Sequence, residues 1–206
     1  MGILDLFRKR ETPETDLPPE GSGVLTLLFG SSPELLNQLN EDVSIYRETG
    51  LEIAPHKTDA VQEVQRIISS ARPGILHLLA SFTDRGSLVD ASGGELFLKE
   101  LMRLSEDSGV RLFIIASQNH FDNIKGQIAK TMAMNFLTLM NRNRHFGTFL
   151  RGIITGLSKD PNFALAYVKL APQSQRAQQG LPLPGSIAIC PAKKGKNLVL
   201  WSEAQP

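Results

Sequence analysis

The sequence is poor in the features that build cross-links, membrane spans and strong electric fields. It holds one cysteine, Cys190, among 206 residues, so the chain can form no disulfide within itself and no zinc site with several cysteines. The formal net charge is only +1, which gives no reason to expect nucleic acid as a partner. No apolar run reaches the roughly 18 residues that a membrane span needs. These absences predict a cytoplasmic protein, membrane-peripheral at most, with no metal and no cofactor.

Composition divides the chain into a short N-terminal segment, a linker, a body and a C-terminal region. Residues 11–23, ETPETDLPPEGSG, hold too much proline, glycine and acid to build a core and are predicted to be a linker. Residues 24–171 form the predicted α/β domain. Residues 172–206 are predicted to be a loop and a β-hairpin, in which SIAIC and LVLW flank the basic turn PAKKGKN.

The N-terminal segment, residues 1–10, combines apolar and basic side chains. This pattern predicts a weak contact with an anionic membrane surface or a partner groove. The alternative is a solvated terminus. The residues predicted to make the contact are Leu4, Leu6, Phe7, Arg8, Lys9 and Arg10.

Within the body, apolar runs of strand length alternate with segments of helical periodicity. Uninterrupted apolar strands are typical of a sheet that is buried on both faces by helices. The alternation therefore predicts a three-layer, doubly wound α/β fold with a mainly parallel sheet. Ser32 and Asp59 are predicted to cap the first two helices. The predicted strands are VLTLLF (24–29), LEIAP (51–55), ILHLLA (75–80), VRLFIIAS (110–117), NFLTLM (135–140) and FALAYVKLA (163–171), and the helix between the third and fourth is predicted over 95–109.

Polar residues follow three of these strands, at the edge where open α/β sheets bind ligands. The stretches are 30–32, 81–85 and 117–122, and the strands 75–80 and 110–117 are expected to end side by side. The candidate ligand-binding residues are Gly30, Ser31, Ser32, Ser117 and Asn119, and the candidate catalytic residues are His77, Ser81, Asp84, Ser117 and His120.

Several kinds of functional site are possible at this edge of the sheet. A serine hydrolase would use Ser81 or Ser117, but neither lies in a G-x-S-x-G turn. A phosphate site at GSSPE is physically sensible, because helix N-termini attract anions, but no glycine-rich phosphate motif accompanies it. A metal at His120 and Asp122 would need further ligands, so a solvated loop is preferred. The run NRNRHF at 141–146 is interpreted as a solvated turn, with docking of an acidic partner as the alternative.

The order of these segments resembles the caspase-like fold, and within it the CHAT family. The resemblance rests on ILHLLASF and FIIASQNH, on the connection GSLVDASGGELFLKEL, and on the later NFLTLM and FGTFLRGIITGL, and it covers residues 24–170. In that family one strand ends in His-Gly and the next in Ala-Cys, and the two residues form a cysteine protease dyad. Here the histidine position falls on Ser81 and the cysteine position on Gln118.

Without an imidazole and a thiol at these positions, the resemblance implies a chain that lacks the dyad chemistry. We therefore expect a non-catalytic interaction or scaffold module of a bacterial-type intracellular assembly, which binds a protein partner or a second copy of itself. The alternative is a hydrolase or a small-anion-binding protein that uses the strand-end cleft.

Overall fold

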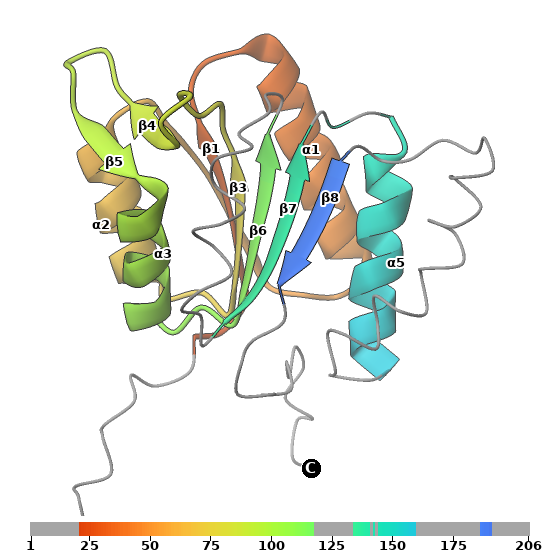
Figure 1. The fold of residues 1–206 in the computed structure, drawn as a ribbon. Coiled ribbons are helices and arrows are strands. Elements are labelled where there is room, and N and C mark those ends of the chain that lie inside the picture. Colours follow the sequence, from red (N-terminus) through yellow and green to blue (C-terminus); the bar gives the residue numbers. More distant parts are fainter. Residues whose placement is uncertain (1–20, 118–133, 141, 143, 160–185, 191–206) are drawn as a thin grey trace, which may run out of the picture.

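The computed structural model describes residues 21–117, 134–140, 142, 144–159 and 186–190 (Figure 1). They form one six-stranded sheet between two layers of helices, which confirms the predicted α/β fold with a mainly parallel sheet. The strands are β1 (Val24–Phe29), β2 (Ile53–Thr58), β3 (Ile75–Leu79), β6 (Leu112–Ser117), β7 (Asn135–Met140) and β8 (Ser186–Cys190). Their order is β2-β1-β3-β6-β7-β8, and only β8 runs antiparallel to its neighbour.

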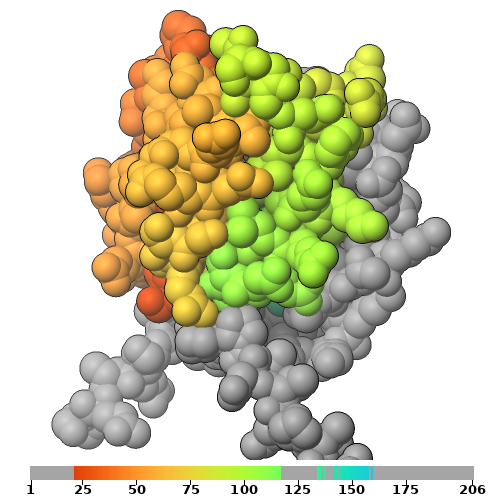
Figure 2. Space-filling model, turned by 90° about the vertical axis from the view of Figure 1, so that its left-hand side faces the viewer, coloured from red at the N-terminus to blue at the C-terminus, as the bar shows by residue number. Residues whose placement is uncertain are grey.

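In the described part of the chain, two helices cover each face of the sheet. Helices α1 (Pro33–Glu48) and α5 (Phe146–Lys159) contact each other on one face. Helices α2 (Val61–Ala71) and α3 (Leu98–Asp107) contact each other on the opposite face, where Figure 2 shows them as adjoining yellow-orange and green bands. None of the helices in the ranges given above is long and apolar enough to cross a membrane.

The side chains of the strands pack into two separate cores because successive side chains of a strand point to opposite faces of the sheet. In β3, Leu76 and Leu78 pack with the α2/α3 layer, whereas Ile75 and Leu79 pack with the α1/α5 layer. All five residues of β3 are buried, which is the burial on both faces that an uninterrupted apolar run predicts. The third residue on the α1/α5 side is His77, in the middle of the strand.

Strand β2 is displaced from its prediction and lies at the edge of the sheet. It spans residues 53–58 instead of 51–55, and its four central residues are exposed. Pro55 and Lys57 lie on this edge, where a missing N–H group and a charge oppose pairing with another chain. The edge position explains why the sequence of β2 is less apolar than that of the other strands.

The predicted helix 95–109 was wrong at its start. Residues 95–97 form strand β5 (Glu95–Phe97), which pairs antiparallel with β4 (Ser87–Val89), and α3 begins only at Leu98. The carboxylate of Asp90, in the connection between β4 and β5, accepts the backbone N–H groups of Val61 and Gly94. Asp90 therefore caps α2 from a distant part of the chain.

The predicted cap of α2 at Asp59 was also wrong. The N-cap position is Ala60, whose backbone N–H donates to the hydroxyl of Thr58, and Asp59 is exposed. Ser32 does hold the N-cap position of α1, although its side chain makes no capping hydrogen bond.

The last residues of the predicted linker pack on the body. The N–H of Gly21 donates to the carbonyl of Gly109, and a Cβ on Gly21 would lie 2.3 Å from the carbonyl oxygen of Pro73. Only glycine fits this close approach. The predictions for 1–10, for the strand 163–171 and for the second hairpin strand at 198–201 fall outside the described residues.

Candidate functional site

The carboxyl ends of three parallel strands meet at one edge of the sheet. Strand β3 lies between β1 and β6, and all three run parallel, so Phe29, Leu79 and Ser117 end their strands at the same edge, and the residues that follow Ser117 lie outside the described part of the chain. This arrangement confirms the expected adjacency of the strands 75–80 and 110–117. Of the candidates here, Ser31, Ser81 and Asp84 are exposed and Ser32 is half-buried, whereas Asn119 and His120 lie outside the described residues.

The first strand end is partly occupied by the fold itself. The N–H of Gly30 donates to the carbonyl of Thr58 at 2.9 Å and is therefore not available to an anion. Gly30 has a φ of 122°, a conformation that favours glycine. Pro33 follows the N-cap Ser32 as the first helical residue, which is its preferred position. Anion binding by Ser31 and Ser32 stays a prediction.

The loop after β3 is fastened by a chain of hydroxyl groups. The Thr83 hydroxyl donates to the Ser87 hydroxyl at 2.6 Å, and the Ser87 hydroxyl donates to the Glu95 carboxylate at 2.6 Å. Arg85 lies over the ring of Phe97, with its Cζ 5.4 Å from the ring centroid. These contacts hold the loop against the β4–β5 pair, so its polar side chains have a structural role.

His77 lies in the core and not at the strand end. It is fully buried on the α1/α5 side of β3, and its register neighbour on β1 is Thr26. Its ring makes edge contacts with Tyr46 of α1 and Phe146 of α5, at centroid separations of 5.7 and 5.9 Å. A histidine in this position cannot meet a substrate in a strand-end cleft.

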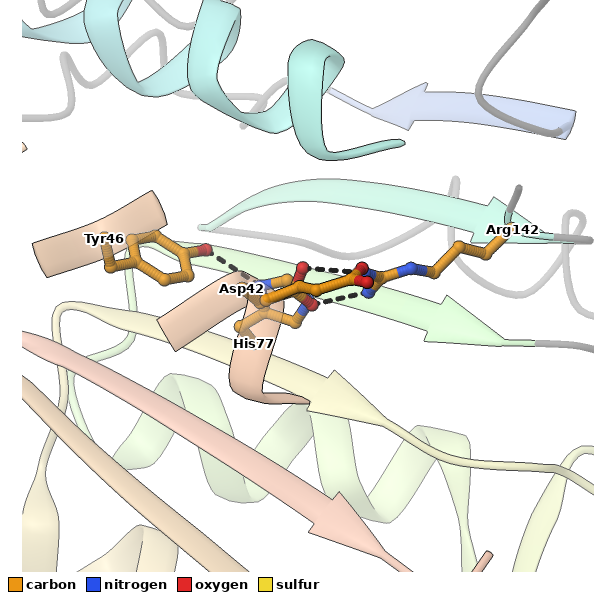
Figure 3. A network of polar contacts seen from close by, with 5 residues as sticks. Asp42, Tyr46, His77 and Arg142 are labelled. Atoms are coloured by element: carbon orange, nitrogen blue, oxygen red, sulfur yellow. Dashed lines mark hydrogen bonds and ion pairs between the residues drawn. The ribbon is translucent and has the colours of Figure 1, made fainter. Parts of the chain in front are cut away.

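Four residues from three parts of the fold form a polar network around His77 (Figure 3). The Tyr46 hydroxyl lies 2.9 Å from His77 Nδ1, and Asp42 Oδ2 lies 3.2 Å from His77 Nε2. Arg142, which follows β7, donates through Nη1 to Asp42 Oδ2 and through Nη2 to Asp42 Oδ1 at 2.9 Å. We call Asp42, Tyr46, His77 and Arg142 the polar network.

The charges within the polar network are nearly removed from water. The side chains of Asp42 and His77 are fully buried and that of Arg142 is 3% exposed. Burial, followed by the charge of Asp42, raises the pKa of Tyr46 well above its ordinary value of 10, so the hydroxyl stays protonated. A protonated Tyr46 can donate to His77 Nδ1, which leaves the Nε2 side facing Asp42.

The interpretation of 141–146 as a solvated turn is wrong for Arg142. Its guanidinium contacts two carboxylates of α1, those of Asp42 and Glu41, and lies 4.3 Å from the centroid of the Phe146 ring. Arg142 is therefore not free to dock an acidic partner, whereas Arg144 is exposed.

Sequence reasoning named His77 but missed Asp42, Tyr46 and Arg142 as its partners. One signal was present. Asp42 lies on the same face of α1 as the buried residues Leu39 and Tyr46, and His77 lies within an apolar strand. A carboxylate and an imidazole in apolar patterns are rarely buried without a partner, so each predicts a polar contact in the core.

The chain is similar to caspases in its fold. It matches the crystal structure of caspase-1 from Spodoptera frugiperda with 11% identity and a TM-score of 0.49, over 84% of this chain and 87% of that chain. It matches the crystal structure of drICE with 10% identity and a TM-score of 0.39, over 84% of this chain and 91% of that chain. No family model and no curated protein matches the sequence. At these values the likeness concerns the fold and not a site, and the closer resemblance to the CHAT family stays a prediction.

Proposed function

We propose that this chain is a non-catalytic caspase-like module for protein interaction or scaffolding in an intracellular assembly. The observation that supports it most is the position of His77. Tyr46 occupies one ring nitrogen and Asp42 faces the other, so neither nitrogen is available as a base for Ser81.

The surroundings of Ser81 also support a non-catalytic module. Ser81 is exposed two residues beyond the end of β3, while the side chain of His77 lies inside the α1/α5 layer. A nucleophile and its base must lie within hydrogen-bond reach of each other. The nearby hydroxyl groups are also engaged in structural hydrogen bonds, because Thr83 donates to Ser87 and Ser87 donates to the carboxylate of Glu95.

The experiment that tests the proposal is a search for peptide cleavage by the purified full chain. We expect no cleavage above buffer and no labelling by covalent probes for nucleophilic serine or cysteine. Cleavage that Ser81→Ala or Gln118→Ala abolishes, and that the control Ser44→Ala on the exposed side of α1 leaves intact, would contradict the proposal.

Self-association is the first form of interaction to measure. Light scattering over a wide range of concentrations should show a mass that rises above that of one chain, 22.6 kDa. A chain that stays monomeric throughout would exclude self-association and leave only binding to a different protein.

A further inference from the structure

Arg142 closes the interface between α1 and the beginning of α5. Its guanidinium binds both oxygens of Asp42 on α1 and lies against Phe146, the first residue of α5. Glu41 approaches Nη2 at 3.3 Å from the outside, with its side chain 70% exposed. The side chain of Arg142 is therefore held on α1 by its buried positive charge, which faces the buried negative charge of Asp42.

Removal of Arg142 from this position would leave the carboxylate of Asp42 buried without its counter-charge. An uncompensated charge in a protein interior is strongly unfavourable. The groups that face His77 are Asp42 and Tyr46 from α1, Phe146 from α5, Thr26 from β1 and Ile114 from β6, together with the nearby Arg142.

Among these groups only His77 can supply a replacement positive charge. Tyr46 is neutral because burial raises its pKa, and Thr26, Phe146 and Ile114 do not titrate. His77 Nε2 is already 3.2 Å from Asp42 Oδ2, the same oxygen that Arg142 Nη1 contacts. A proton added to Nδ1 would find the oxygen of Tyr46 as an acceptor at 2.9 Å.

We propose that Arg142 and a proton on His77 are alternative counter-charges for Asp42, so that the side chain of Arg142 leaves α1 only with uptake of a proton. Acid then favours the released form, because that form binds one proton more than the closed form. The network links pH to the α1/α5 face of the domain, independently of the function proposed above.

The titration of the His77 ring in the full chain tests this exchange. NMR of histidine labelled at Cε1 should show that Arg142→Met raises the midpoint by about one pH unit or more, a tenfold gain in proton affinity. The added change Asp42→Asn should remove this gain, because the attracting charge is then absent. The control Arg151→Met breaks the exposed ion pair with Glu48 between the same two helices and should leave the midpoint unchanged. Equal midpoints in the wild type and Arg142→Met would overturn the proposal.

A measurement on the wild-type chain does not depend on the folding of any variant. The Nε–H of Arg142 should lose protection from solvent exchange, relative to that of exposed Arg47, by up to about tenfold per pH unit over the pH range in which NMR shows His77 taking up a proton. Protection of Arg142 that stays constant through that titration would overturn the proposal.

Discussion

Replacement of Asp42 by asparagine should destabilise the domain by about 3 kcal/mol. The amide has the size of the carboxylate but no charge, so the side chain of Arg142, 3% exposed in the native structure, loses its buried counter-charge. Removal of one partner of a buried ion pair costs about 3–5 kcal/mol. The lower end applies because Glu41 remains 3.3 Å from the guanidinium and the long arginine side chain can shift toward water.

Urea unfolding measures this cost. At a typical slope of about 2 kcal/mol per molar urea, the midpoint should fall by about 1.5 M. Arg142→Met should cost a similar amount, because it leaves Asp42 charged and buried. The double variant should be more stable than the sum of the two single changes predicts, by about 1–3 kcal/mol, because the partners interact directly.

The ion pair of Arg151 with Glu48 supplies the matched control. It joins the same two helices, but its side chains are 48% and 53% exposed. Glu48→Gln should therefore cost at most about 1 kcal/mol. A loss for Asp42→Asn no larger than that for Glu48→Gln would refute the assignment of the polar network as a buried ionic contact.

Three further predictions test other parts of the molecule. Tyr46→Phe should cost about 1–2 kcal/mol in the same assay, because it leaves Nδ1 of His77 without its partner in the core; an unchanged midpoint would contradict this hydrogen bond. Hydrogen bonds from the side chain and backbone of Ser92 and from backbone N–H groups lower the pKa of Asp90 from 3.8 to about 2. The carboxylate therefore stabilises the fold above about pH 4 and ceases to do so as the pH falls through about 2, so the difference in Tm between the wild type and Asp90→Asn should narrow over that interval; a constant difference would show that the charge is not responsible. Deletion of residues 1–10 should reduce co-sedimentation with anionic vesicles at low salt, with neutral vesicles as the control; equal sedimentation of both chains would exclude this segment as a membrane contact.

The sheet could be predicted because its strands carry the signal in consecutive residues. The run 75–79 is apolar except for His77, and its short length between turn signals is typical of a strand that is buried on both faces. The edge strand β2 was misplaced because only part of it is buried. The β4–β5 pair was missed because each of its strands has only three residues, too few to show a period.

The polar network could not be predicted because its contacts join residues far apart in the sequence. Tyr46 and His77 are separated by 31 residues, and Asp42 and Arg142 by 100. Arg142 lies in a polar stretch, where a solvated turn is the ordinary interpretation. The contacts of Arg142 with Asp42 on α1 and Phe146 on α5, which only the folded chain brings together, bury this arginine.

The two layers of the domain are stabilised differently. On the α2/α3 side the described core is mostly apolar, and its buried Ser105 donates to a backbone carbonyl of its own helix, so the side chains tolerate repacking as long as volume is conserved. On the α1/α5 side the ion pair of Asp42 and Arg142 is buried beside the side chains of His77 and Tyr46, and separating the pair would leave an uncompensated charge in the core. After a shift of α1 by one turn along the sheet, other apolar side chains of the helix could take over most of the apolar contacts of this layer. The same shift would separate Asp42 from both His77 and Arg142. The polar network therefore fixes where α1 and the start of α5 lie on the sheet, while the apolar residues around it supply most of the free energy of packing.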